Sequence, residues 1–321
     1  MTETLPSWPL FGLADDPRPA LRACREAGEN AALATIVALD GGGPRPVGTQ
    51  MVIAESLVSG FLSGGCLEAD VAGHAREVLA TGEPRRLVYG EGSPWPDIRL
   101  LCGARIYVLL EAVPTDDPAV ERLLAAAEAR EPTLWRSDGR RRTCDGDAWG
   151  AAYEKRFDPQ LRLIVLGSDP TALAIATLGA QTGCETVLVR PRGPSEAPPL
   201  PDVTYRREDP AAALAAIGLD PWTAVAVATH DAIVDHEALV AALPSLAFYV
   251  GALGARRRLE ERLDALRRSD IGGADLSRLH APIGLDIGGK APWEVAIAVM
   301  AEIIALRKGA SASSSVGRTD A

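Results

Sequence analysis

Short apolar runs and amphipathic stretches alternate in the first third of the chain. The runs that have the length of strands are 31–39, 49–54, 57–62, 85–89 and 99–111. Residues 17–28 read as a helix, and a second helical pattern after Gly65 places Leu67, Val71 and Val78 on one face, ending at Gly82. This alternation predicts an N-terminal domain of mixed α/β structure.

From residue 161 onward the pattern becomes more regular. Apolar strands are predicted at 161–167, 186–189, 224–229 and 246–251. Helices are predicted at 171–183, 210–217 and 236–243, with a long one at 292–308. Parallel strands that alternate with helices indicate a doubly wound sheet. The C-terminal domain is therefore predicted to be Rossmann-like, with a doubly wound parallel sheet.

These patterns divide the chain into four parts. The N-terminal domain takes residues 1–113, and the Rossmann-like domain takes 161–309. The connecting segment 114–160 contains one helical pattern, two short strand-like runs and two Asp-Gly turns. Residues 310–321 are small and polar, so this tail is expected to be disordered.

Composition and charge exclude several classes of protein. A net charge of −10 argues against general nucleic-acid binding, which needs a basic face. No apolar run is long enough to span a bilayer and the first residues do not resemble a signal peptide, so we expect a cytoplasmic protein. The five cysteines include no CxxC pair, which fits neither a disulfide framework nor a zinc site, and no metal site is predicted.

The strongest chemical signal is the segment Ser63-Gly64-Gly65-Cys66 between a strand and a helix. Glycine lets a ligand approach the backbone, and N–H groups of a first helical turn attract anions. The helix dipole would favour the thiolate of Cys66, a soft nucleophile or metal ligand. The alternative is that Cys66 is a small buried apolar residue and the glycines only form a turn. Glu68, in the first turn, is expected to stay in water.

The first turn of the Rossmann-like domain departs from the dinucleotide fingerprint GxGxxG/A. Gly167 and Ala172 keep the first and last positions, but Asp169 replaces the middle glycine. Its Cβ and negative charge lie where a pyrophosphate would press against the backbone. Arg190 also stands near the place where NAD binding needs an acidic residue. We therefore predict a Rossmann scaffold that has lost ordinary NAD(P) binding.

Three later junctions hold further candidates. His230 follows an apolar strand, where open α/β sheets bind ligands; it is either an acid/base group or a residue that packs at the strand end. Gly254 and Arg256 form either an anion site or the start of a solvated basic helix. In the segment with Asp286, Gly288 and Lys290, the lysine can reach a phosphate or a carboxylate.

Four segments together resemble one family. They are Pro44-Arg45-Pro46-Val47-Gly48-Thr49-Gln50-Met51, Gly60 to Glu68, Cys102-Gly103-Ala104 and Pro282 to Glu294. In these segments the chain resembles the XdhC/CoxI family, accessory proteins that mature molybdenum-cofactor enzymes. It departs from the family pattern at Ala104, where a second glycine is usual, and at Ala255, where a serine is usual. Asp169 and Arg190 are further departures.

The resemblance implies a function. Family members bind the molybdenum cofactor, a molybdopterin, assist its sulfuration with a cysteine desulfurase, and insert it into enzymes of the xanthine dehydrogenase type. The chain is thus expected to be a chaperone rather than a catalyst, to partner such an apo-enzyme, and to form a homodimer. The cofactor-binding residues that this implies are Arg45, Gln50, Ser63, Gly64, Gly65, Cys66, Glu68, Cys102, Gly103, His230, Gly254, Arg256, Asp286, Gly288 and Lys290.

Two other functions stay open at this stage. One is an NAD(P)-linked oxidoreductase that uses His230 as its acid/base group, which tight NAD(P) binding would identify. The other is an adaptor that joins the molybdoenzyme and the desulfurase without touching the cofactor. A stable complex with apo-enzyme that carries no pterin would favour the adaptor.

Overall fold

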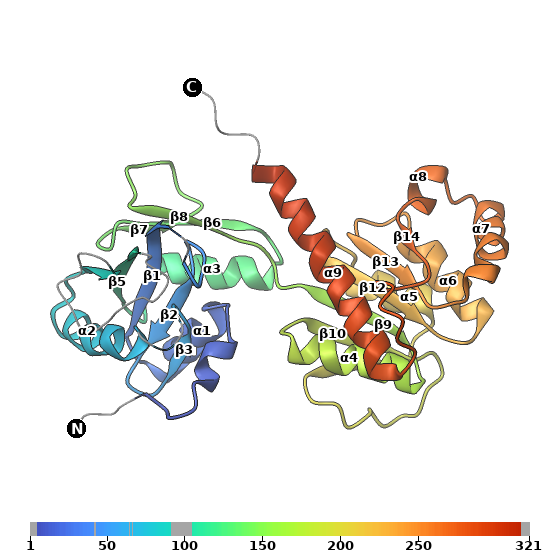
Figure 1. The fold of residues 1–321 in the computed structure, drawn as a ribbon, viewed down its shortest axis with the longest axis horizontal. Helices are drawn as coiled ribbons and strands as arrows, with labels where there is room; N and C mark the ends of the chain where they lie inside the picture. The colour runs from blue at the N-terminus through green and yellow to red at the C-terminus, as the bar shows by residue number, and fades with distance from the viewer. Residues whose placement is uncertain (1–4, 42, 64, 66, 91–104, 316–321) are drawn as a thin grey trace. The chain divides into compact units, whose positions relative to one another are not determined.

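The computed structural model describes residues 5–41, 43–63, 65, 67–90 and 105–315. The chain forms two compact units, Met1–Pro159 and Gln160–Ala321, which Figure 1 shows in blue to green and in green to red. Each unit has its own sheets and its own apolar clusters, so each is described by itself.

The first unit is built on a five-stranded sheet in the order β3-β2-β1-β5-β4. All of its neighbouring strands are antiparallel. The strands are β1 (Ala31–Asp40), β2 (Gln50–Ile53), β3 (Val58–Gly60), β4 (Arg85–Gly90) and β5 (Arg105–Val113). Residues Ala31–Ile36 of the central strand are buried without interruption, which explains why this stretch is apolar rather than alternating.

Both faces of this sheet are covered. Helix α2 (Glu68–Thr81) packs on one face and buries Val71, Ala75 and Val78 there. The other face is covered by α1 (Arg18–Ala27), α3 (Pro118–Glu128) and a second sheet. That sheet has the order β7-β6-β8 and consists of β6 (Thr133–Ser137), β7 (Arg142–Cys144) and β8 (Tyr153–Phe157). A short 3-10 helix, Leu10–Leu13, precedes α1.

The segment 114–160, which the sequence suggests as a connection, is folded against the first unit. Helix α3 and the second sheet supply Leu123, Trp135 and Phe157 to the same apolar cluster as α1 and β1. Trp135 is completely buried. Contacts within residues 1–159 therefore place this segment in the first compact unit.

The second unit contains the predicted Rossmann-like sheet. Its strands are β9 (Arg162–Gly167), β10 (Glu185–Val189), β11 (Val203–Arg206), β12 (Thr223–Ala228), β13 (Tyr249–Ala252) and β14 (Leu279–His280). They pair in parallel in the order β11-β10-β9-β12-β13-β14. The chain order reverses between β9 and β12, as in dinucleotide-binding sheets. The predicted fold class is confirmed.

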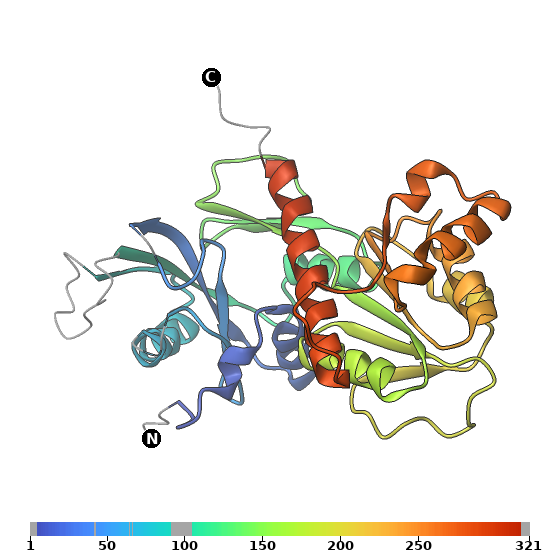
Figure 2. The same ribbon diagram turned by 45° about the vertical axis from the view of Figure 1, so that its right-hand side comes forward.

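Helices cover both faces of this sheet. Helices α4 (Pro170–Gln181) and α9 (Pro292–Ser315) pack on one face and lie side by side in Figures 1 and 2. Helices α5 (Pro210–Ile217), α6 (Ala232–Ala242) and α7 (Leu259–Arg268) pack on the other. The 3-10 helix η2 (Arg256–Arg258) and α8 (Gly273–Leu276) complete the unit.

The C-terminal helix is longer than the sequence predicts. Helix α9 continues to Ser315, past its predicted end at residue 308. Residues 316–321 lie outside the described residues. Within the described parts of the chain, none of the helices combines the length and apolarity that a bilayer crossing requires.

Candidate functional site

The carboxylate of Glu68 organises the loop between β3 and α2. It accepts hydrogen bonds from the backbone N–H groups of Leu62 at 3.0 Å, Ser63 at 2.7 Å and Leu67 at 3.2 Å, and from the Ser63 hydroxyl. Glu68 is only 1% exposed, so the prediction that it stays in water is wrong. The sequence suggests that these N–H groups bind an anionic ligand. In the structure they bind the carboxylate of Glu68 instead.

Gly65 is the described member of the predicted Gly-Gly-Cys segment. Its φ of 100° lies in the region that favours glycine, and its missing side chain faces open space. The helix begins at Glu68, two residues after Cys66. The predicted candidates Gly64, Cys66, Cys102 and Gly103 lie outside the described residues.

The segment that carries Arg45 and Gln50 lies on the neighbouring strand. Met51 of β2 pairs with Gly60 of β3, so the two motifs of this unit are adjacent in the sheet. Gln50 is buried: its amide donates to Thr35 Oγ1 at 3.2 Å and accepts from Lys155 Nζ at 2.8 Å. Its predicted contact with cofactor stays a prediction.

Arg45 pairs with the carboxylate of Asp15. Lys155, on β8, lies next to this segment and was not among the predicted site residues. Burial lowers its pKa to about 8, a change that the neighbouring carboxylates of Asp15 and Asp16 oppose. The one signal available from sequence is that Lys155 is the only lysine in residues 1–159.

In the second unit, Asp169 closes the turn that would hold a pyrophosphate. Its Oδ1 accepts from the backbone N–H of Ala172 at 2.9 Å and so caps α4, while its Oδ2 lies 3.0 Å from His230 Nε2. A Cβ on Gly167 would collide with the carbonyl oxygen of Ala228, which explains why that glycine is kept. The helix N-terminus is therefore occupied by the chain's own carboxylate.

Replacing Asp169 with alanine is expected to lower the free energy of unfolding by about 1 kcal/mol, because α4 loses its N-cap. Urea denaturation followed by circular dichroism measures this. Asp169→Asn is the matched control, since asparagine caps as well as aspartate. Equal loss in both variants would mean that the pair with His230, rather than the cap, stabilises the turn.

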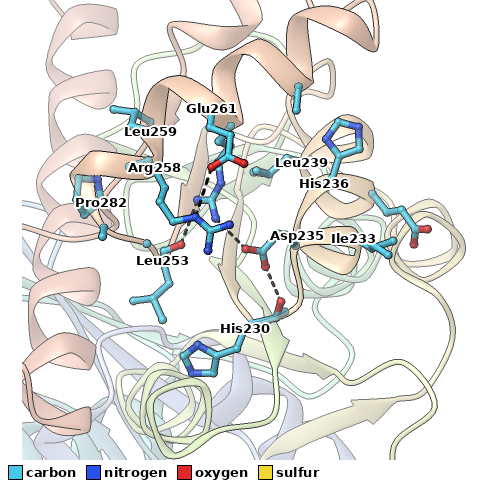
Figure 3. A pocket seen from close by; sticks show the side chains of 18 of the residues that line it. His230, Ile233, Asp235, His236, Leu239, Leu253, Arg258, Leu259, Glu261 and Pro282 are labelled. Carbon is cyan, nitrogen blue, oxygen red and sulfur yellow. Dashed lines mark hydrogen bonds and ion pairs between the residues drawn. The ribbon is translucent and has the colours of Figure 1, made fainter.

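A pocket of about 990 Å³ opens between α6 and α7 in the second unit. Figure 3 shows His230, Asp235 and Arg258 around it. Its floor follows the ends of β12 and β13, the edge at which parallel sheets bind ligands. The predicted residues His230 and Gly254 both line it, and the side chain of Arg256 lies outside the described residues. Its charged lining residues are Asp235, Glu237, Arg257, Arg258, Glu261, Arg262 and Arg268.

Asp235 anchors the inner wall of this pocket. It accepts from Thr229 Oγ1 at 2.5 Å and from Arg262 Nη2 at 2.8 Å, and it is 5% exposed. Burial raises the pKa of Asp235, although the Thr229 hydroxyl and the Arg262 guanidinium act in the opposite direction. Helix α7 has no side-chain cap at its N-terminus.

With four arginines against three carboxylates, the lining suits an anionic ligand.

The third junction precedes α9. Glu294 accepts from the backbone N–H groups of Lys290 at 2.9 Å and Ala291 at 3.0 Å, and these bonds lower its pKa. A carboxylate of the chain again binds the helix N-terminus that the sequence offers to a phosphate. Gly288 has a φ of 79°, and the side chains of Asp286 and Lys290 are exposed.

Glu302, on α9, is bound by groups from three other segments of the second unit. Its carboxylate accepts from Tyr249 Oη at 2.6 Å and from the N–H of Gly284 at 2.9 Å, and lies 3.3 Å from His280 Nδ1. His280 also stacks on Tyr249 with ring centroids 4.8 Å apart. These contacts hold the start of the segment 282–290 against β13.

The residues that the structure describes contain no cluster of side chains that supports metal binding. No group of three or more His, Cys, Asp or Glu side chains there is arranged to hold an ion. Cys24 and Cys184 are buried, and burial raises the pKa of each thiol. Neither thiol is therefore poised as a thiolate.

Two family models match this chain. Residues 163–303 match a family model described as the XdhC Rossmann domain, and residues 24–90 match one described as the XdhC and CoxI family. The chain is 34% identical over 306 residues to the molybdenum cofactor insertion chaperone PaoD of Escherichia coli strain K12. That match spans 92% of this chain and 90% of PaoD.

Two further proteins are similar. One, from Bacillus subtilis strain 168, is described as a probable subunit of xanthine dehydrogenase; it is 30% identical over 159 residues, which are 49% of this chain and 46% of that protein. A solved structure described as a xanthine dehydrogenase from Bacillus halodurans has a TM-score of 0.75 at 23% identity, over 92% of this chain and 96% of that one; it shows the same fold. With both family models matched and PaoD aligned over nearly its whole length, the chain belongs to the XdhC and CoxI family.

Proposed function

We propose that this protein binds the molybdenum cofactor and inserts it into an apo-enzyme of the xanthine dehydrogenase type. The observation that carries the proposal is the 34% identity to a molybdenum cofactor insertion chaperone along 92% of the chain. Supporting it, the relative in Bacillus subtilis is described as a probable subunit of xanthine dehydrogenase. Sulfuration of the cofactor by a cysteine desulfurase, a homodimer and a cytoplasmic location are further parts of the proposal.

Each unit supplies a candidate contact with the cofactor. In the first, Cys66 lies in sequence between Ser63 and Leu67, whose N–H groups bind Glu68, and we propose that its thiolate contacts the molybdenum–sulfur end of the pterin. The second unit offers a separate candidate, the pocket with His230 and Gly254, whose arginines and buried carboxylate Asp235 suit the polar edge of a pterin. We propose the other residues that the family resemblance implies as further contacts with the cofactor.

The oxidoreductase alternative is less well supported. Asp169 caps α4 with one oxygen and meets His230 with the other, so a pyrophosphate would have to displace both interactions. The adaptor alternative differs from our proposal in a single respect, because an adaptor carries no pterin. Pterin loading therefore separates the adaptor from the chaperone.

Cys66→Ala tests the proposal. We expect the variant, purified without oxygen from a host that makes the cofactor, to lose most of the pterin that the parent carries. Released pterin is measured by fluorescence and molybdenum by mass spectrometry. Cys144→Ser is the matched control, since Cys144 is a half-buried cysteine of the same unit whose Sγ lies 3.0 Å from Thr133 Oγ1. Equal loading of parent and Cys66→Ala would remove Cys66 from the site.

A further inference from the structure

We propose that Arg18, Arg45 and Lys155 form a binding site for the phosphate group of a phosphomonoester in the first unit. The three residues come from the start of α1, the loop before β2, and β8. The site goes beyond the contacts named so far, because neither Arg18 nor Lys155 is part of any recognised motif. It rests on the proposed function only in naming the pterin cofactor as the phosphomonoester.

Three observations place the side chains near one another. Arg18 Cζ lies 5.5 Å and Lys155 Nζ 4.5 Å from the centroid of the Phe157 ring. A Cβ placed on Gly48 would lie 3.9 Å from Lys155 Cδ, so the loop that carries Arg45 passes directly beside the lysine. Arg18 and Arg45 are also among the charges that act on the Lys155 ammonium group.

Two guanidinium groups in this cluster have buried nitrogens with no partner. Arg18 is 8% exposed and uses Nε and Nη2 to bind Asp16, at 2.9 Å and 2.7 Å, which leaves its buried Nη1 without an acceptor. Arg45 binds Asp15 through Nη2, and its buried Nε is also without an acceptor. Buried donors are nearly always satisfied, so these two N–H groups are available to an acceptor from outside the chain, either water or an anion.

The charges around the site favour an anion with several oxygens. Three cations face two carboxylates, Asp15 and Asp16, and the positive end of α1 adds to the cations. Arg18 stands at the first position of that helix, and Asp16, which its guanidinium binds, is the anion that compensates it there. Two guanidinium groups and an ammonium group approach from three elements, an arrangement that suits the separate oxygens of a phosphate.

The pKa of Lys155 provides a direct way to detect a bound phosphate. Its pKa is lowered to about 8, chiefly by burial, with Arg18 and Arg45 acting in the same direction and Asp15 and Asp16 against it. A bound phosphate favours the charged amine and should raise this pKa. Binding should in turn weaken as the pH rises through about 8 and the free lysine loses its charge.

The experiment is competitive acetylation of the full chain as a function of pH, with and without inorganic phosphate. The chain has three lysines, Lys155, Lys290 and Lys308, so peptide mass spectrometry resolves each one. We expect the acetylation midpoint of Lys155 to lie near 8 without phosphate and to move upward with it, while that of Lys308 stays constant. An unchanged midpoint at saturating phosphate would overturn the site.

A variant tests the arginine contribution. Arg45→Gln is expected to weaken phosphate binding, measured by calorimetry, by about tenfold or more, as the loss of a hydrogen bond to a charged group implies. Arg140→Gln is the matched control: Arg140 is in the same unit, 68% of its side chain is exposed, and it pairs with Glu83. Equal binding in the two variants would contradict the proposal. If circular dichroism shows that Arg45→Gln is misfolded, Lys155→Gln takes its place.

The site and the proposed function can fail separately. A phosphate-dependent shift of Lys155 in a protein that never carries pterin keeps the phosphomonoester site and removes the pterin cofactor as its ligand. A protein that carries pterin, but whose Lys155 does not respond to phosphate, keeps the proposed function and overturns the site.

Discussion

Replacing Arg142 with alanine is expected to lower the free energy of unfolding by about 3–5 kcal/mol, because it leaves a buried carboxylate unpaired. The guanidinium of Arg142 donates to Glu111 Oε2 at 3.1 Å, to Asp117 Oδ2 at 2.5 Å and to the carbonyl oxygen of Ala112 at 2.6 Å. Glu111 is fully buried on β5, and Asp117 caps α3. One side chain therefore joins β7 to the central sheet and to a helix.

Urea denaturation at neutral pH measures this loss. Arg122→Ala is the matched control: Arg122 pairs with Glu131 and Asp145 on the surface, and an exposed pair contributes about 0–1 kcal/mol. A loss below about 1 kcal/mol for Arg142→Ala would contradict the account.

The pH dependence of that loss has a defined sign. Burial already raises the pKa of Glu111 in the parent, and Arg142 is the first of the groups that lower it. Without Arg142 the pKa of Glu111 rises further, so the folded variant binds a proton at a higher pH than the unfolded chain does. Its stability deficit is therefore expected to shrink as the pH falls from neutral. A deficit that is constant over this range would mean that Glu111 does not titrate.

Glu68→Ala is expected to have the second large effect, a loss of about 3 kcal/mol, since several buried N–H groups lose their acceptor. The variant should also carry less pterin, because the loop from Leu62 to Leu67 that contains Cys66 is no longer held. Stability is measured by urea denaturation and loading by pterin fluorescence. Glu77→Ala is the control on the same helix, where the side chain is 56% exposed and pairs with Arg85.

Glu68→Gln refines the test. Glutamine keeps the size of the side chain, but its NH₂ group would face backbone donors in place of one carboxylate oxygen. We expect an intermediate loss of stability. If Glu68→Ala matched the parent in both stability and loading, the carboxylate would not be what orders this loop.

The periodicity of the chain predicted the main strands of the two larger sheets and the Rossmann-like fold of the second unit, because buried strands and helices differ clearly in spacing. It could not predict the role of Glu68. An acidic residue in a first helical turn is typical of solvent-exposed positions, and only the path of the chain at Ser63 turns its carboxylate inward. Helix α9 runs to Ser315, past its predicted end at residue 308, because the spacing of apolar residues no longer marks a helix where the residues are small and polar.

Contacts between distant segments could not be predicted from the sequence, for a different reason. Arg18, Arg45 and Lys155 are widely separated along the chain, and no local pattern brings their elements together. Glu302 is an acidic residue in an apolar stretch of α9, and its partners Tyr249 and His280 follow from the parallel pairing of β13 with β14. Local spacing identifies a residue that requires a partner, whereas tertiary packing decides which partner it has.

The central claim is that this chain carries the pterin cofactor, and pterin content tests it most directly. The protein is purified without oxygen from a host that makes the cofactor and a loaded molybdoenzyme, and the released pterin and molybdenum are measured. We expect about one pterin per protein chain. Absence of pterin from the protein, while the molybdoenzyme from the same cells is loaded, would contradict the account and favour an adaptor.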